Sequence, residues 1–545
     1  MRTARGKRVD WMGDGLTALC GGALGLNLLL VAALLSVLIY NGVGYFWPRP
    51  VTRLELAGGA VVLGEILDRE PIFETLDAGV PAMRIRIKVG NRDLGSADFR
   101  WIDERDIVSR SLPPQAVVLE RVEWGNFYGT MVELRHGAEV LSTGPEEVWA
   151  SFRLLRERKL DELAVARRLE RKEIGAVNHE MERLRLERKR LEGTPPSAET
   201  SDALRAIEDE QVRLESRFEA LSQRLFDLRE DLVAETLIVE AADGTRAEIP
   251  VVEVVRAVRP NVLDTAQASG VYVSRVWEFL SGEPRESNTE GGIFPAIFGT
   301  VMMVFIMSFA VAPLGVLAAL YLREYAKQGP VVRMVRIAVN NLAGVPSIVF
   351  GVFGLGFFVY LIGGSIDQVF YPEALPTPTY GTGGILWGSL TLALLTVPVV
   401  IVATEEGLAA VPRVVREGSL ALGATKFETV WRVVVPAAAP GILTGLILAM
   451  ARAAGEVAPL MIVGMVKLAP SLPIDGYFPF VHFERKFMHL GFHIYDVGFQ
   501  SPNVEATKPL VFATALLLVV VVTVMNLVAI AVRNRLRAKY ASSAV

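Results

Sequence analysis

Residues 405–456 decide the fold, and they read EEGLAAVPRVVREGSLALGATKFETVWRVVVPAAAPGILTGLILAMARAAGE. This stretch lies between two apolar runs that can each cross a bilayer, but its first half alternates charged and apolar side chains. The pattern predicts two short amphipathic helices with a bend at residues 423–425. Pro436 and Pro440 would end the second helix before the next span. Because a simple connection does not need so much apolar surface, we interpret the stretch as a docking element for a soluble partner.

The spacing of residues in this loop resembles the loop motif of ABC importer permeases. That motif is Glu-Ala-Ala, then Gly after three residues, then Ile-x-Leu-Pro after nine more. The matching positions are Glu417, Gly418, Ser419, Gly423, Val433, Val435 and Pro436. The resemblance implies that residues 405–439 form the coupling loop, whose helices fit a cleft on the ATPase subunit. The alternative is a loop that only reverses the chain.

The composition is that of a membrane protein with a polar middle. Of the 545 residues, 51% are hydrophobic, and the apolar runs lie at the N-terminus and after residue 290. The net charge of -4 offers no dominant basic surface, so we expect no nucleic-acid partner. The single cysteine, Cys20, excludes an intramolecular disulfide. No nucleophile or acid/base constellation, metal-ligand spacing or phosphate-binding loop stands out, so we expect neither enzyme activity nor a cofactor in this chain.

Six apolar runs predict a polytopic α-helical membrane protein. They are Leu16–Tyr40, 291–322, Ile337–Ile362, Ile385–Ala403, Ile442–Val466 and Leu510–Val532. A cleaved signal peptide is the alternative for the first run, but an aromatic belt follows it rather than a small-residue cleavage site. Residues 343–347, AGVPS, predict a break or a kink in the third run. Arginine and lysine gather before the first run, in two loops and after the last, which places both termini in the cytoplasm.

The polar middle, residues 48–290, would then lie in the periplasm. Alternating patterns over residues 51–145 and 235–260 predict a β-rich domain. Between them, residues 146–234 carry two heptad seams joined by a Pro-rich loop, which predicts an inserted antiparallel coiled-coil hairpin. The pattern leaves open whether this hairpin is a structural spacer or an arm that binds a partner.

Two charged residues break the rules for membrane segments. Arg452 and Glu456 lie four residues apart in the fifth run, and the pattern predicts that they share one helix face. An arginine there costs about 2.5 to 3.5 kcal/mol on translocon scales, so such residues usually face a bundle interior or a water-filled path. One reading places Arg452 on a translocation path for an anion, with Glu456 orienting it or weakening its hold. The other reading is a pair that only joins helices.

Three segments narrow the resemblance to the PstA-type permeases of the phosphate-specific ABC importer. They are GGIFPAIFGT at 291, NNLAGVPSIVFGVFGLG at 340 and MARAAGEVAPLMIVG at 450. The resemblance covers residues 291–545 closely and the first span, within residues 1–47, only loosely. It implies that the Arg-x3-Glu segment at Arg452 and Glu456 takes part in transport. The large insertion departs from compact members of the family, and no role carries over to it.

The resemblance also implies a transport system. Its other parts would be a second permease of PstC type, a pair of PstB-type ATPase subunits that bind ATP and magnesium, and a periplasmic phosphate-binding protein. The chain would sit in the bacterial inner membrane and move inorganic phosphate inward by alternating access. Two alternatives stay open, namely a permease for another oxyanion such as sulfate or molybdate, and a membrane scaffold or sensor that uses the periplasmic hairpin.

Overall fold

The computed structural model describes residues 11–72, 82–95, 97–501 and 504–541. They form two compact units. The helical unit lies within residues 1–46, 295–355 and 384–545, and the mixed unit lies within residues 47–294 and 356–383. The basic residues at positions 2–8, on which the expected N-terminal orientation partly depends, lie outside the described residues.

Six helices among the described residues are long and apolar enough to cross a membrane, which is the number expected from the sequence. They are Gly15–Gly44, Phe294–Tyr325, Ser347–Phe370, Ile385–Ala410, Lys426–Gly455 and Thr507–Ala538. Helix α10 (Ile385–Ala410) is the most enclosed of these helices, because 67% of the residues in its most apolar stretch are buried. In the corresponding stretch of α1 (Trp11–Gly44), 0% are buried. Residues of α6 (Phe294–Leu320), α10 and α13 (Val435–Gly455) supply much of the core of the helical unit.

The third span differs from the prediction. The expected run began at Ile337, but residues 330–342 form a separate helix, α7 (Pro330–Leu342), and the spanning stretch begins with α8 (Ser347–Phe353). The stretch continues through a π-helical segment, η9 (Gly354–Gly363), into α9 (Gly364–Phe370). Proline has no backbone N–H and disfavours helix in the residue before it, so Pro346 separates the two helices.

The fifth span also differs from the prediction. Residues 426–455 are continuously helical through α12 (Lys426–Thr429), the π-helical η11 (Val430–Val434) and α13, so Pro436 and Pro440 do not end the helix. Transmembrane helices tolerate proline where neighbours satisfy the freed carbonyl groups. The helix instead ends at Gly455, about ten residues before the expected boundary, and a short helix, α14 (Ala458–Val463), follows.

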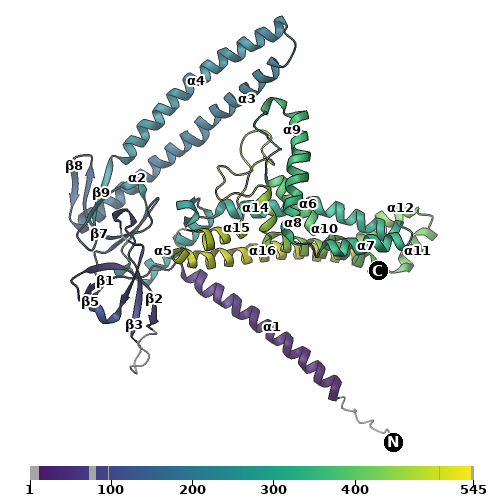
Figure 1. Cartoon of the computed structure of the whole chain (residues 1–545), viewed down its shortest axis with the longest axis horizontal. Helices are drawn as coiled ribbons and strands as arrows, with labels where there is room; N and C mark the ends of the chain where they lie inside the picture. The colour runs from purple at the N-terminus through teal and green to yellow at the C-terminus, as the bar shows by residue number, and fades with distance from the viewer. Residues whose placement is uncertain (1–10, 73–81, 96, 502–503, 542–545) are drawn as a thin grey trace. The chain divides into compact units, whose positions relative to one another are not determined.

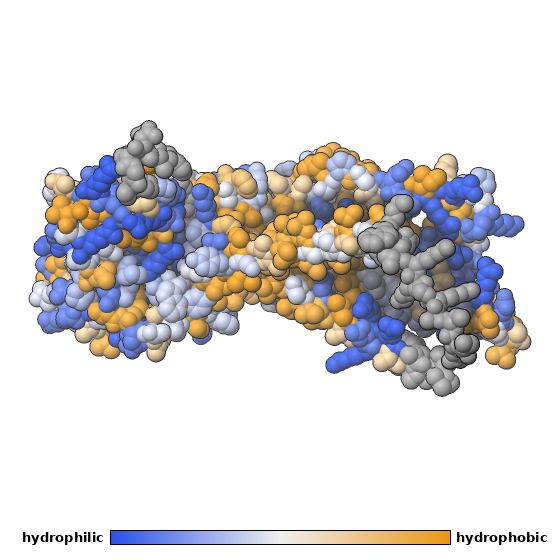
Figure 2. All heavy atoms as spheres, turned by 90° about the horizontal axis from the view of Figure 1, so that it is seen from below, coloured by the Kyte–Doolittle hydropathy of each residue, from blue (hydrophilic) through white to orange (hydrophobic). Residues whose placement is uncertain are grey.

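The surface of the helical unit is suited to lipid. Apolar side chains cover much of it in the view of Figure 2. On α6, Phe309 is 86% exposed and Leu314 is 58% exposed, values that are costly in water. The last helix, α16 (Val504–Ala541), carries exposed valines and leucines in the same way.

The mixed unit contains two antiparallel sheets. One has the order β4-β3-β2-β1-β5, and the other has the order β10-β9-β7-β6-β11 with β8 also paired to β7. The first five strands are Val51–Leu56, Val61–Pro71, Met83–Lys88, Phe99–Asp103 and Ile107–Ser111. Strands β6 to β11 are Val117–Arg121, Phe127–His136, Glu139–Thr143, Glu235–Glu240, Arg246–Pro250 and Val254–Val258. Helix α5 (Thr265–Ser281) and a small hairpin, β12 (Pro284–Arg285) with β13 (Glu290–Gly291), follow them.

A long helical hairpin is inserted between β8 and β9. One arm runs through α2 (Pro145–Arg168), a π-helical turn and α3 (Gly175–Glu192), and the other arm is α4 (Ala198–Val233). The arms lie side by side (Figure 1) and bury two apolar clusters between them. The base of α2 belongs to the sheet core, because Phe152 packs there with Phe127 and Leu237.

Candidate functional site

The loop after α10 folds into two short helices, α11 (Arg413–Ala421) and α12. Gly423 makes the bend between them at a φ of 88°, a backbone conformation that side chains disfavour. Thr425 then caps α12. Its hydroxyl accepts a hydrogen bond from Glu428 N, and Glu428 Oε2 accepts one from Thr425 N at 2.9 Å. This capping box, which the sequence analysis did not single out, fixes where the second helix begins.

The outer face of this loop is apolar and exposed. Leu422 is 91% exposed, and the rings of Phe427 and Trp431 stack with centroids 6.3 Å apart. Val414 and Leu420 are exposed as well. Exposed apolar side chains gathered in this way are typical of an interaction surface. Docking of a soluble partner on this face stays a prediction.

The inner face of the loop is tied to the end of α6. The Arg416 guanidinium donates to Glu324 Oε1 at 2.9 Å and to the carbonyl oxygen of Leu408 at 2.7 Å. Glu324 belongs to η8 (Tyr321–Tyr325), the π-helical extension of α6. The Lys426 ammonium lies over the Tyr325 ring, 5.0 Å from its centroid. The sequence analysis missed Glu324 and Tyr325, since nothing in their own segment indicates a contact with residues about 90 positions later.

The predicted loop residues fall into two groups. Glu417 and Gly418 are exposed on α11, and the Ser419 hydroxyl lies 2.9 Å from that of Thr429. Val433, Val435 and Pro436 are half-buried in the continuous helix of the fifth span. The Ser419–Thr429 contact therefore joins the first helix of the loop to the start of that span. Their role in coupling stays a prediction.

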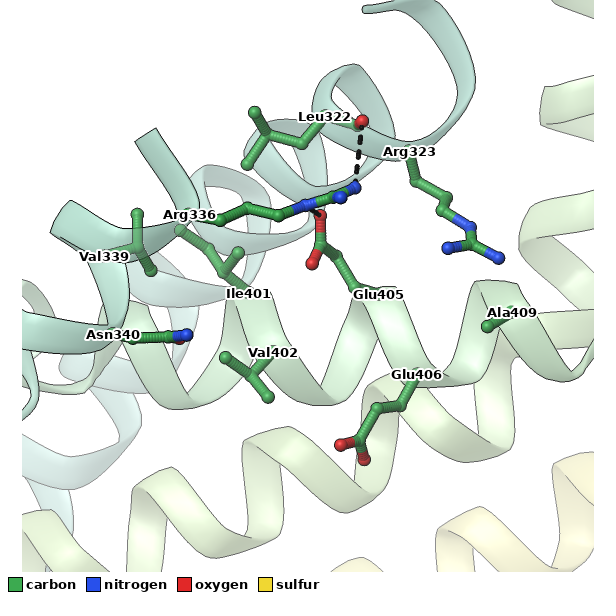
Figure 3. Close-up of a pocket in the computed structure, with 10 residues that line it drawn as sticks. All are labelled: Leu322, Arg323, Arg336, Val339, Asn340, Ile401, Val402, Glu405, Glu406 and Ala409. Carbon is green, nitrogen blue, oxygen red and sulfur yellow. Dashed lines mark hydrogen bonds and ion pairs between the residues drawn. The ribbon is translucent and has the colours of Figure 1, made fainter. Parts of the chain in front are cut away.

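An open cavity of 290 Å³ lies where α6, α7 and α10 end, next to this loop. Figure 3 shows Arg336 of α7 between the Glu405 carboxylate and the backbone carbonyl of Leu322. Its guanidinium is 3.1 Å from Glu405 Oε1 and 3.4 Å from Leu322 O. The remaining lining residues are Arg323, Val339, Asn340, Ile401, Val402, Glu406 and Ala409. Two arginines and two glutamates leave no net positive charge there to attract an anion.

Arg452 and Glu456 lie close together but not on one helix face. Arg452 is in the last turn of α13, whereas Glu456 follows the helix end with an extended backbone, at φ -82° and ψ 129°. The expectation of a shared face was wrong because the helix ends at Gly455. Arg452 Nε is 3.6 Å from Glu456 Oε1, and the side chains are 35% and 22% exposed. Whether they line a translocation path stays a prediction.

The segment between α14 and α16 holds buried histidines that the sequence analysis did not single out. His489 is the N-cap of α15 (Leu490–Tyr495) and His493 lies within this helix, and burial lowers the pKa of each imidazole to about 4. Asp496 is buried beside them and pairs with Lys467 at 3.1 Å. Among the described residues, no group of three histidine, cysteine or carboxylate side chains could hold a metal ion.

Comparison with known proteins is consistent with this architecture. The family described as "Binding-protein-dependent transport system inner membrane component" matches residues 311–538. The probable ABC transporter permease protein YqgI of Bacillus subtilis is 32% identical over 260 residues, which are 46% of this chain and 81% of that protein. The related YqgH of the same organism is 32% identical over 36% of this chain, but the match spans only 60% of its own length.

A third relative is named as a permease of a phosphate transport system. The phosphate transport system permease protein PstA 1 of Mycobacterium tuberculosis is 34% identical over 244 residues, which are 45% of this chain and 71% of that protein. The matched part of this chain contains α10, the loop with α11 and α12, and the last two spans. The chain therefore belongs to the binding-protein-dependent transport system inner membrane components, as a PstA-type permease subunit of an ABC importer.

Proposed function

We propose that this chain moves inorganic phosphate from the periplasm to the cytoplasm by alternating access. The observation that carries the proposal is the loop of α11 and α12, which presents an exposed apolar ridge and is tied on its other side to span ends. In the proposed mechanism, ATP hydrolysis in separate subunits drives transport, and the loop of α11 and α12 is the surface on which those subunits act. The phosphate assignment is supported by the names of PstA-type relatives.

The proposed complex has four kinds of chain. A pair of PstB-type ATPase subunits binds ATP and magnesium and docks on the loop from the cytoplasm. A PstC-type permease pairs with this chain, and a periplasmic binding protein delivers phosphate. The termini are cytoplasmic and residues 48–290 are periplasmic in this arrangement, because arginines follow the last span and gather in the loops that hold α7 and α11.

Arg452 is the proposed contact for the passing anion. A single guanidinium attracts phosphate, which carries one to two negative charges near neutral pH, without the several charge-assisted hydrogen bonds of a tight site. Glu456, 3.6 Å away, competes for the same guanidinium and so weakens its hold on the anion. Fast release matters in a permease more than tight binding, since the binding protein supplies the affinity.

Uptake measurements with the reconstituted complex test this proposal. Proteoliposomes that hold all four kinds of chain should take up labelled phosphate when ATP is supplied. Arg452→Gln should abolish uptake while the complex still assembles, whereas Arg535→Gln, on the exposed end of α16, should leave uptake unchanged. Uptake that survives in Arg452→Gln would make Arg452 structural. Transport of sulfate or molybdate instead of phosphate would retain the permease and reject the substrate.

A further inference from the structure

Arg416 joins the loop to an element that is distant in the sequence. It lies on α11, and its guanidinium donates to the carbonyl oxygens of Leu408 and Val411 at the end of α10, at 2.7 Å and 2.5 Å. The same group donates to Glu324 of η8 at 2.9 Å. The last carbonyls of a helix have no partners within it, so Arg416 satisfies two of them while it holds the end of α6.

The contact between the loop and α6 extends beyond this ion pair. Lys426 of α12 lies over Tyr325, so both helices of the loop contact η8. An apolar cluster lies against the same junction and joins the ends of α6 and α10 to η11 and α13. Its buried members are Leu320, Leu408, Val411, Val430, Val434, Ala438 and Ile442.

A second arginine continues the connection to α7. Arg336 is 3.1 Å from Glu405, which lies near the end of α10, and it also donates to the carbonyl oxygen of Leu322 at the end of α6. Gln328, in the turn between α6 and α7, accepts a hydrogen bond from Arg336 at 3.2 Å. Both arginines therefore contact one short segment, residues 322–328, and each has a carboxylate partner.

The loop is covalently connected to two of these helices but not to α6 or α7. The loop is continuous with α10 on one side and with the fifth span on the other, so a force on it reaches those two helices through the backbone. It can reach α6 and α7 only through side-chain contacts. Both carboxylates of the two pairs are mostly shielded, with Glu324 12% exposed and Glu405 20% exposed, so solvent and salt screen these pairs less than surface pairs.

We propose that Arg416 with Glu324, and Arg336 with Glu405, are positioning residues that make α6 and α7 move together with the coupling loop. The inference rests on the proposed function and names the residues through which that loop acts. Loss of the Arg416–Glu324 pair lets the loop move without α6, so less substrate is transported for each ATP hydrolysed. The Arg336–Glu405 pair has the same effect through α7.

The test compares transport with ATP hydrolysis in the same proteoliposomes of the complete complex. Glu324→Gln removes the ion pair but leaves the carbonyl contacts of Arg416, so it is the cleaner variant. We expect uptake per ATP hydrolysed to fall about fivefold, at the lower end of coupling between distant sites, while ATP hydrolysis is retained. Lys327→Gln, an exposed charge in the same segment, is the matched control and should keep the wild-type ratio.

A double variant separates coupling from general damage. If Arg416 acts through Glu324, Arg416→Gln with Glu324→Gln should lose about as much as Arg416→Gln alone, whereas independent effects would multiply that loss by about a further fivefold. Multiplied losses, or a wild-type ratio in Glu324→Gln, overturn the proposal. Where Arg416→Gln does not assemble, Arg416→Lys keeps the charge and should lie between wild type and Glu324→Gln.

The same experiment tests the proposed function and the proposed junction by two different measurements. Wild-type uptake of phosphate tests the substrate, and the ratio between variant and wild type tests the junction. If wild type moves another oxyanion, the phosphate assignment fails and the same ratio, measured with that anion, still decides whether Glu324 and Arg416 are coupled. If wild type moves phosphate with the same ratio in every variant, the function stands and the junction is rejected.

Discussion

At the scale of single residues, Glu290 of the mixed unit is a carboxylic acid held in a largely buried environment. Burial raises the pKa of its carboxyl group to about 7, with Glu286 adding to the rise and Lys88 opposing it. A pKa above the ordinary 4.5 means that the folded state prefers the protonated form. The free energy of unfolding is therefore greatest below about pH 4.5 for this group and falls as the pH rises through 7, by at most about 3 kcal/mol.

Replacement of Glu290 by glutamine should remove this dependence. Because the amide is neutral at every pH, Glu290→Gln should unfold a few degrees above wild type at pH 8, and the difference should shrink toward pH 5. Tryptophan fluorescence of the full chain during heating measures it, since five of the eight tryptophans lie within residues 47–294. Glu187→Gln, an exposed charge on α3, controls for charge removal. A difference that does not vary with pH would contradict the assignment.

Residue types alone pointed to some candidate site residues and missed others. Arg452 stands out in any sequence because arginine is rare in an apolar run. Glu324 does not, since a glutamate at the end of a span is ordinary, and its importance comes from Arg416, 92 residues later. Partners in an ion pair are set by tertiary packing, which periodicity does not encode.

At the scale of elements, Gly423 sets the bend between α11 and α12. Its φ is 88°, and a Cβ at this position would meet nothing within 4 Å. An alanine here is therefore disfavoured by backbone strain alone, by about 1 to 2 kcal/mol. Asparagine adopts this conformation more readily than alanine does.

Substitutions at Gly423 should weaken docking of the ATPase subunits without loss of the permease. If the strain is relieved only when the bend opens, Gly423→Ala should lower the affinity about 5- to 30-fold. Gly423→Asn should lower it less. Titration of ATPase subunits onto the permease complex in lipid nanodiscs gives the affinities, and equal values for the two variants would exclude a role for the left-handed bend.

Periodicity located most elements but misplaced two helix boundaries. Apolar runs indicated the six helices of the described residues that are long and apolar enough to cross a membrane, and the heptad seams indicated the two arms of the inserted hairpin, because both patterns repeat over many residues. The errors came from proline and glycine. Pro346 separates two helices, whereas Pro436 lies inside one, and the difference depends on neighbouring helices that a local pattern does not include.

At the scale of the whole molecule, the orientation in the membrane is the first property to measure. The proposed topology puts the tip of the inserted hairpin outside and the segment after α6 inside. Cysteines at Ala198 and at Lys327, both exposed, report on these places once the native Cys20 is replaced. A membrane-impermeant maleimide should label Ala198→Cys in spheroplasts, and Lys327→Cys only after the membrane is opened. The reverse pattern would invert the topology.

The place of the hairpin has a consequence for the order of folding. Strands β8 and β9 both pair with β7, yet the 91 residues from Gly144 to Ala234 separate them. A disordered connection of that length would cost about 2 kcal/mol more to close than one of about six residues. Helices with local contacts form within microseconds, long before distant strands meet. An early hairpin would therefore bring its own ends together and shorten the search by which β9 finds its place in the sheet.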